Sequence, residues 1–229
     1  MSESGPPVLL VHGWGGSFAE TWQRSGMTAL IEDAGRPVIG VDLLGHGSAP
    51  KPHDPDDYND MTQRILEVLP TEPVDAIGFS LGAITLLQLA CKNPGRLNRV
   101  VCGGIGENVF RKDDERRQRL IAGVEGRADA SDIDAQVFGN YADRPGQDPV
   151  ALAAILKRTK GYALTPERLA TVSIPVLVAI GDKDFAGPGD PLAAALPNST
   201  LKVLRNVDHF ATPEAFAFID AALEFLDCV

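Results

Sequence analysis

The stretch VDAIGFSLGAITLLQLA, from Val74 to Ala90, decides the fold of this chain. It opens with a short apolar run typical of a buried strand, turns at Gly-Phe-Ser-Leu-Gly, and continues with apolar residues at helical spacing. A serine at such a strand-to-helix turn holds its hydroxyl exposed above the sheet, beside the N–H groups that open the helix. The five-residue pattern alone is short enough to arise by chance. The strand before it and the helix after it favour Ser80 as a nucleophile over an ordinary glycine-rich turn.

The rest of the chain repeats this alternation of strand and helix. Continuous apolar runs, typical of strands buried on both faces, cover residues 8–11, 37–43, 74–79, 99–103, 174–180 and 200–204. Helical patterns fall between or after them, at 19–34, 60–69, 81–92 and 213–227. Because strands that alternate with helices indicate βαβ units, the sequence predicts an α/β fold with a mostly parallel sheet of about six strands flanked by helices.

One interval, from residue 107 to residue 172, lacks any strand pattern. It holds charged, alanine-rich helical pieces separated by glycine and proline, and a structureless loop of that length would be unusual. We therefore expect a helical cap at 107–172, inserted into an α/β core formed by residues 1–106 and 173–229. The cap would cover the edge of the sheet where the strands end. Its aromatic residues either contact substrate or hold together a small core of the cap. These residues are Phe110, Phe138, Tyr141 and Tyr162.

Composition is that of an ordinary globular protein. The 229 residues suit one α/β domain with an insertion, and the net charge of −10 makes nucleic acid a poor partner, because phosphate binding requires clustered Lys and Arg. The chain has no run of about 18 apolar residues, and its N-terminal MSESGPP lacks the pattern of a signal peptide. Three widely spaced cysteines indicate free thiols in a reducing compartment. We expect a cytoplasmic monomer or homodimer that does not bind membranes.

A serine nucleophile needs a base, and the chain has four histidines. His209 follows the last predicted strand and precedes the final helix. Since parallel strands end at one edge of a sheet, His209 would lie on the edge that carries Ser80. His12 also ends a strand, but its place within a glycine turn favours a hydrogen-bonded structural role. His46 and His53 lie in loops and could serve either role.

The base in turn needs a carboxylate that fixes its tautomer and stabilises the imidazolium. Asp182 and Asp184 both follow the fifth predicted strand, and either could reach His209. Asp208 is the immediate neighbour of His209, which makes it a poor orienter and a surface residue. Position along the chain leaves the choice between Asp182 and Asp184 open.

The order Ser, Asp, His along the chain resembles that of the α/β-hydrolase fold family. Three further segments resemble motifs of that family. The HGWGG stretch at His12–Gly16 resembles its oxyanion loop, DLLGHGS at Asp42–Ser48 resembles the segment after the next strand, and 174–181 resembles the apolar strand before the acid. The resemblance covers nearly the whole chain apart from the cap.

The resemblance implies particular roles for residues of this chain. The acid would be Asp184, the last residue of a G-x-x-D pattern, and the backbone N–H groups of Trp14 and Leu81 would form the oxyanion hole. The Trp14 side chain would wall the substrate pocket, serve in apolar packing, or do both. Trp22, on the first predicted helix, is assigned to the core. Many members carry a further strand pair before the oxyanion strand, for which this chain has no room, so a trimmed sheet is expected.

The opening glycines do not match a dinucleotide-binding fingerprint. The G-x-G-x-x-G pattern that would begin at Gly13 has Phe18 in place of its third glycine, and Asp42 lies farther on than the ~20 residues expected. No Walker A or H-E-x-x-H motif occurs, and no Cys/His cluster has zinc spacing. We therefore expect neither a metal nor a cofactor.

The resemblance implies a serine hydrolase that cleaves a carboxylic ester of a small molecule, or a thioester or lactone, through an acyl-enzyme. Ser80 excludes the branches that use an aspartate nucleophile, while C–C hydrolases and cofactor-free perhydrolases stay open. The HGWG stretch followed by Trp22 is similar to small carboxylesterases of the pimeloyl-carrier methyl-ester type. The alternative from another class is a ligand receptor or signalling protein, because some members keep the triad residues for that role.

Overall fold

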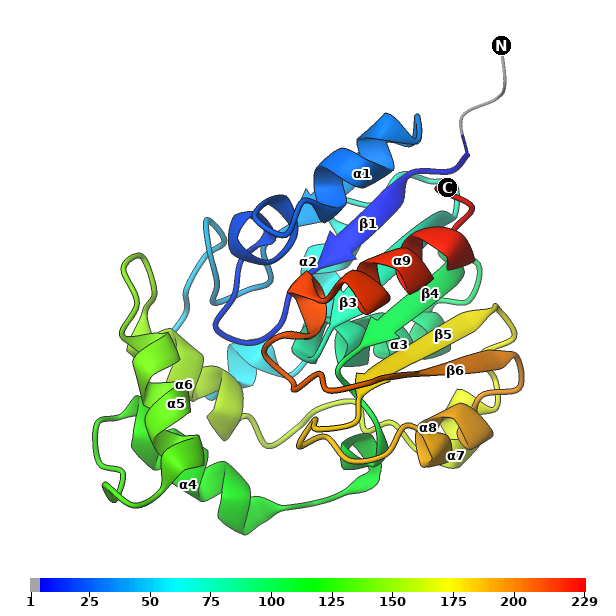
Figure 1. Cartoon of the computed structure of the whole chain (residues 1–229). Coiled ribbons are helices and arrows are strands. Elements are labelled where there is room, and N and C mark those ends of the chain that lie inside the picture. The colour runs from blue at the N-terminus through cyan, green and yellow to red at the C-terminus, as the bar shows by residue number, and fades with distance from the viewer. Residues whose placement is uncertain (1–4) are drawn as a thin grey trace.

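The computed structural model describes residues 5–229, in which a six-stranded sheet lies between layers of helices (Figure 1). The strand order is β2-β1-β3-β4-β5-β6, and every pair is parallel. The strands are β1 Val8–Val11, β2 Val38–Val41, β3 Val74–Phe79, β4 Leu97–Gly103, β5 Val176–Gly181 and β6 Ser199–Leu204. All six predicted runs form strands, so the predicted α/β fold is confirmed. Residues 1–4 lie outside the described residues. They belong to the predicted core and to the N-terminal stretch in which no signal peptide is expected.

Helices cover both faces of the sheet. One face carries η1, a π-helical turn at Ala19–Gln23, α1 (Met27–Asp33) and α9 (Phe216–Phe225), which η4 (Thr212–Glu214) precedes. The other carries η2 (Pro55–Tyr58), α2 (Thr62–Leu66), α3 (Leu81–Lys92), α7 (Pro166–Leu169) and α8 (Asp190–Ala195). The helix predicted over 19–34 is divided in two, because Gly26 takes a left-handed backbone (φ 82°) before α1.

Each strand contributes to two hydrophobic cores, because successive side chains point to opposite faces of a sheet. Leu9 of β1 packs in the core that contains α3, and its neighbour Leu10 packs in the core that contains α1 and α9. Trp22, assigned to the core, is fully buried there and stacks on Phe218, with ring centroids 6.4 Å apart. Burial on both faces explains why β1 and β5 are continuous apolar runs, whereas the edge strands β2 and β6 are partly exposed. Within residues 5–229, no helix has the length and apolarity needed to cross a bilayer.

The segment between β4 and β5 is helical. It contains η3 (Glu107–Phe110), α4 (Asp114–Val124), α5 (Ile133–Ala142) and α6 (Pro149–Lys157), followed by α7. An aspartate begins each of α4, α5 and α6 by accepting a hydrogen bond from a first-turn N–H, which is a strong start signal. Figure 1 shows α4, α5 and α6 beyond the carboxyl ends of the strands, whereas α7 lies beside α8. These three helices therefore stand at the edge of the sheet to which Ser80 belongs.

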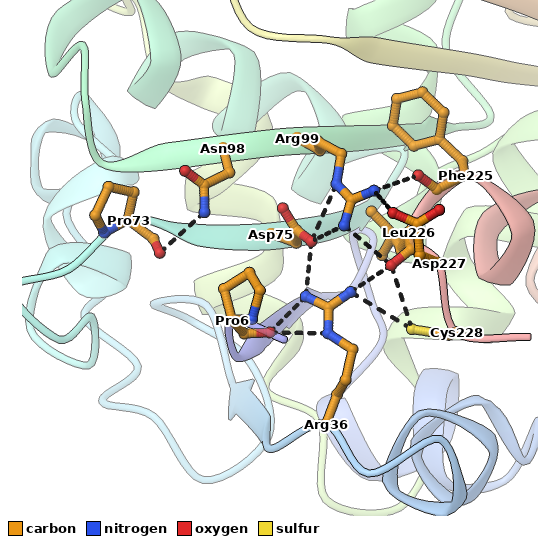
Figure 2. Close-up of polar contacts among 10 residues, drawn as sticks. All are labelled: Pro6, Arg36, Pro73, Asp75, Asn98, Arg99, Phe225, Leu226, Asp227 and Cys228. Carbon is orange, nitrogen blue, oxygen red and sulfur yellow. Dashed lines mark hydrogen bonds and ion pairs between the residues drawn. The ribbon is translucent and has the colours of Figure 1, made fainter. Parts of the chain in front are cut away.

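At the opposite, amino-terminal edge, charged side chains join the sheet to the two chain ends (Figure 2). Asp75 on β3 is fully buried, and its Oδ2 accepts hydrogen bonds from Nη2 of Arg36 (2.7 Å) and Nη2 of Arg99 (2.8 Å). Both guanidinium groups also donate to the carbonyl oxygen of Leu226, at 2.6 and 3.0 Å. Nε of Arg36 donates to the carbonyl oxygen of Pro6 (2.9 Å). One buried carboxylate thus organises the contacts of the segments that precede β1 and follow α9.

Candidate active site

Ser80 lies in the turn between β3 and α3, where two backbones approach closely. Its φ of 50° and ψ of −113° are rare for a residue with a side chain. The flanking glycines make the turn possible. A Cβ on Gly78 would lie 2.7 Å from the nitrogen of Ala83, and one on Gly82 would lie 2.3 Å from the carbonyl oxygen of Val11. The start of α3 therefore packs directly against the end of β1, next to Ser80.

Three of the predicted residues form a continuous line of hydrogen bonds. Nε2 of His209 lies 3.0 Å from Oγ of Ser80, and Nδ1 of His209 lies 2.9 and 3.0 Å from the two carboxylate oxygens of Asp184. His209 and Asp184 are both buried. Because a carboxylate only accepts hydrogen bonds, this arrangement assigns the proton to Nδ1 and leaves Nε2 to accept from the serine hydroxyl.

The other two aspartates near His209 are engaged elsewhere. Oδ1 of Asp182 accepts a hydrogen bond from the backbone N–H of Asn206 (2.8 Å) and is exposed. Oδ1 of Asp208 accepts from the backbone N–H three residues further on (2.9 Å). Of the two candidates that follow β5, the structure therefore brings Asp184 to the imidazole and leaves Asp182 at the surface.

The loop after β1, which contains the HGWGG stretch, lies directly against Ser80. A Cβ on Gly13 would come within 3.3 Å of Cβ of Ser80. The N–H of Trp14 makes no hydrogen bond within the described chain. The N–H of Leu81 belongs to the first turn of α3, where N–H groups lack intrahelical partners. Two unpaired donors thus lie on the two segments that meet beside the serine.

The remaining histidines are not placed to act as a base on Ser80. Nε2 of His12 accepts from a backbone N–H in the loop after β2 (3.1 Å), while its Nδ1 lies 2.7 Å from the carbonyl oxygen of Gly13. Burial lowers the pKa of His12. Burial, and then the neighbouring His12, lower the pKa of His46 to about 3. His53 is exposed, and its Nε2 lies 3.0 Å from a carboxylate oxygen of the aspartate at the start of α6.

A cavity of about 420 Å³ opens above Ser80, within the size range of small-molecule sites. Aromatic rings form part of its lining: Trp14, Phe79, Phe138, Tyr141 and Phe210. Polar side chains form another part: Glu20, Thr21, Arg24, Arg144, Gln147 and Glu214. The cavity therefore combines an apolar surface that can hold an acyl group with polar groups that can orient it.

Of the four aromatic residues named in the segment expected to form a cap, Phe138 and Tyr141, both on α5, line this cavity. The ring of Phe138 stacks on Trp14 with centroids 4.8 Å apart. The ring of Tyr141 stacks on Phe210, directly after His209, at 5.2 Å. The two rings thus join α5 to the loop after β1 and to the loop that carries the imidazole.

Phe110 and Tyr162, also expected to bind substrate, do not line the cavity. Phe110 ends η3, close behind β4, and packs against the hydrophobic core. Tyr162 follows α6, and its ring lies under the guanidinium of Arg168, 4.2 Å from the centroid. Both residues belong to the links between the inserted helices and the sheet, which explains why they pack there and not over Ser80.

Several lining residues have no pattern in the sequence that singles them out. Phe79 and Phe210 are the chain neighbours of the serine and the histidine, so adjacency is the one signal that could have found them. Phe185, next to Asp184, does not line the cavity, but its ring lies tilted against that of His209 with centroids 4.2 Å apart. Gln147 lies in the inserted segment with no local cue. Within residues 5–229, no group of three or more Asp, Glu, His or Cys side chains is arranged to hold a metal ion.

Comparison with known proteins assigns the chain to a family. A sequence model of the alpha/beta hydrolase family matches residues 8–221, and the chain belongs to that family. It is 29% identical to a pimeloyl-[acyl-carrier protein] methyl ester esterase of Neisseria meningitidis serogroup C, over 95% of this chain and 93% of that protein. Its fold is similar to those of the non-heme bromoperoxidase-like protein BpoC from Mycobacterium tuberculosis and an enol-lactonase from Burkholderia xenovorans. The TM-scores are 0.76 and 0.72, each at 20% identity, and the matches cover 99% and 98% of this chain and 94% and 92% of those chains.

Proposed function

We propose that this chain is a serine hydrolase that cleaves a carboxylic ester of a small molecule, or a related acyl bond such as a thioester or lactone. The observation that carries the proposal is the line of hydrogen bonds from Ser80 through His209 to Asp184, beside a cavity of about 420 Å³. The similarity to a methyl ester esterase and to an enol-lactonase supports an acyl–oxygen bond as the target.

In the first step, Oγ of Ser80 attacks the acyl carbon and gives its proton to Nε2 of His209. The electron pair of the carbonyl double bond moves to its oxygen, which becomes an oxyanion. The N–H groups of Trp14 and Leu81 stabilise that charge, because preorganised backbone donors act strongly at a water-excluded site. Asp184 stays ionised and stabilises the imidazolium across the Nδ1 hydrogen bond.

In the second step, the imidazolium of His209 gives its proton to the leaving alcohol oxygen as the carbon–oxygen bond breaks. An acyl-enzyme on Ser80 remains. A water molecule then attacks the acyl carbon while Nε2 of His209 accepts its proton. The bond between the acyl carbon and Oγ of Ser80 breaks as the imidazolium returns that proton to Oγ. The products are one carboxylic acid and one alcohol, and the serine is regenerated.

We propose further that residues 107–172 act as a cap that selects the substrate over a core of 1–106 and 173–229. The stacking of Phe138 on Trp14 and of Tyr141 on Phe210 supports this role, because both rings belong to α5 and line the cavity. An apolar wall of this kind grips an acyl chain and excludes water.

The test is turnover of p-nitrophenyl esters of increasing acyl length, one lactone and one thioester, by the native protein and by Ser80→Ala. Native turnover should fall by about 10⁶ in kcat in the variant, as is typical when a triad member is removed. A variant that keeps more than a few per cent of the activity would place the nucleophile elsewhere. Labelling of Ser80 by a fluorophosphonate without turnover of any ester would support a ligand receptor instead.

A further inference from the structure

The loop after β1 is held from two directions. On the core side, the carbonyl oxygen of Gly13 accepts from the N–H of Gly16 (3.1 Å) and lies 2.7 Å from Nδ1 of His12. The acceptor role of His12 Nε2 assigns the proton to Nδ1, so the imidazole donates to Gly13. The carbonyl of Gly13 and the N–H of Trp14 belong to one planar trans peptide and point in opposite directions. Fixing the carbonyl therefore fixes the direction of the Trp14 N–H.

On the other side, the inserted helices hold the same loop. Nε2 of Gln147 donates to the carbonyl oxygen of Gly15 (2.9 Å), and Nε1 of Trp14 donates to the carbonyl oxygen of Leu152 on α6 (3.2 Å). Gly15 has a left-handed backbone (φ 70°), and a Cβ on it would lie 3.5 Å from the ring of Tyr141. Trp14 and the residue that follows it are thus anchored to the segment between β4 and β5.

We propose that Gln147 is a positioning residue that holds the Trp14 N–H in register for the oxyanion, so that the inserted segment completes the oxyanion hole as well as walling the cavity. This inference rests on the proposed function. The carbonyl oxygen of Gly15 can only accept a hydrogen bond, so the side chain at position 147 must be a donor. Without that donor, the Gly15–Gly16 peptide is released from the segment between β4 and β5, and the loop that carries the Trp14 N–H loses one of the two hydrogen bonds described above to that segment.

The effect should appear in the transition state and not in ground-state binding. Removal of an oxyanion donor costs about 10²–10³ in kcat, and loss of a support for that donor should cost less, about tenfold. KM for p-nitrophenyl acetate should stay within about twofold, because the oxyanion forms only after attack. For the same reason, the inhibition constant of a trifluoromethyl ketone, whose serine adduct carries an oxyanion, should rise by about tenfold.

The experiment compares native protein, Gln147→Met and a matched control, Gln136→Met. Gln136 is a second glutamine of the inserted segment. It is exposed, and its Nε2 donates to the carbonyl oxygen of Asp129 (3.3 Å), far along the chain from the loop after β1. Gln147→Met should lower kcat and weaken the trifluoromethyl ketone, whereas Gln136→Met should change neither. If Gln147→Met does not fold, Gln147→Glu carries the same test, since a carboxylate of similar shape cannot donate to Gly15.

Two results would overturn this inference. The proposed function would still stand in either case, provided that the native protein turns over esters and Ser80→Ala loses that turnover. One is a kcat of the folded Gln147 variant within twofold of native. The other is an equal rise in KM and in the ketone inhibition constant with kcat unchanged, which would mark Gln147 as a binding residue only. Absence of native turnover would instead refute the proposed function, and the inference with it.

Discussion

Both carboxylate oxygens of Asp184 lie within hydrogen-bond distance of Nδ1 of His209, at 2.9 and 3.0 Å. The backbone N–H of Ala186 donates to Oδ1 of the same carboxylate (2.8 Å), which holds it in place. An imidazole gripped in this way keeps one tautomer, and the tautomer determines whether Nε2 can accept the proton of Ser80.

The first prediction concerns this carboxylate. Asp184→Asn should lower kcat/KM for a small ester by about 10⁴, because an amide that donates to Nδ1 stabilises the wrong tautomer of His209. Asp182→Asn is the matched control and should cost less than about tenfold, since the Asp182 carboxylate accepts from the N–H of Asn206 and makes no hydrogen bond with His209 within residues 5–229. The opposite ranking would identify Asp182 as the orienter.

The second prediction distinguishes the aromatic residues of segment 107–172 that line the cavity from those that do not. Phe138→Ala and Tyr141→Ala should shift preference among p-nitrophenyl esters of different acyl length, because both rings line the cavity. The rate on the acetate ester should change less, since the smallest acyl group needs little of that wall. Phe110→Ala and Tyr162→Ala, which remove rings outside the cavity, serve as controls. An unchanged selectivity profile in the Phe138 and Tyr141 variants would show that α5 does not set the specificity.

The third prediction concerns Asp75, the buried carboxylate of Figure 2. Asp75→Asn leaves the buried guanidinium of Arg36 without its counter-ion, and breaking a buried pair in this way costs about 3–5 kcal/mol of unfolding free energy. Urea denaturation of both proteins measures it. Asp227→Asn, which removes the exposed partner of Arg99, should cost at most about 1 kcal/mol. Equal urea midpoints for Asp75→Asn and the native protein would show that the pair of Asp75 and Arg36 does not stabilise the fold.

The fourth prediction concerns acid stability. The pKa of His46 is lowered to about 3 in the folded protein, against 6.5 as its ordinary value. Between these values the unfolded chain binds a proton at His46 that the folded protein does not, so stability must fall as the pH falls. The contribution is about 1.4 kcal/mol per pH unit for one proton. It is absent above about pH 7 and stops growing below pH 3, where the folded protein also binds the proton.

Urea titrations at pH 6 and pH 5 measure this slope, in a range where carboxylates contribute little. His46→Gln, which removes the titrating group, should reduce the slope by about 1.4 kcal/mol per pH unit, whatever it does to the absolute stability. His12, whose pKa is also lowered by burial, leaves a remaining slope in that variant. An identical slope in the native protein and in His46→Gln would show that His46 does not resist protonation when folded.

Much of the fold could be predicted because its determinants are local. Strands β1 and β5 are apolar runs, such as Val8–Val11, that are buried on both faces and need no knowledge of their partners to be found. The turn at Ser80 is equally local, because the glycines at 78 and 82 are required by backbone contacts of the strand and helix that they join. The helix boundary at Gly26 was missed, since helical periodicity continues across a single left-handed residue.

Sequence by itself therefore determined the sheet, the turn and a short set of candidates around it. Tertiary structure decided which of those candidates meet. Asp182 and Asp184 follow the same strand, and only the path of the turn after β5 directs one of them to the imidazole. Phe138 and Phe110 look alike along the chain, yet only the packing of α5 carries one of them to the cavity. Gln147 bonds to Gly15 across 132 positions, and no local pattern encodes a contact between residues so far apart, because it exists only once both segments have packed.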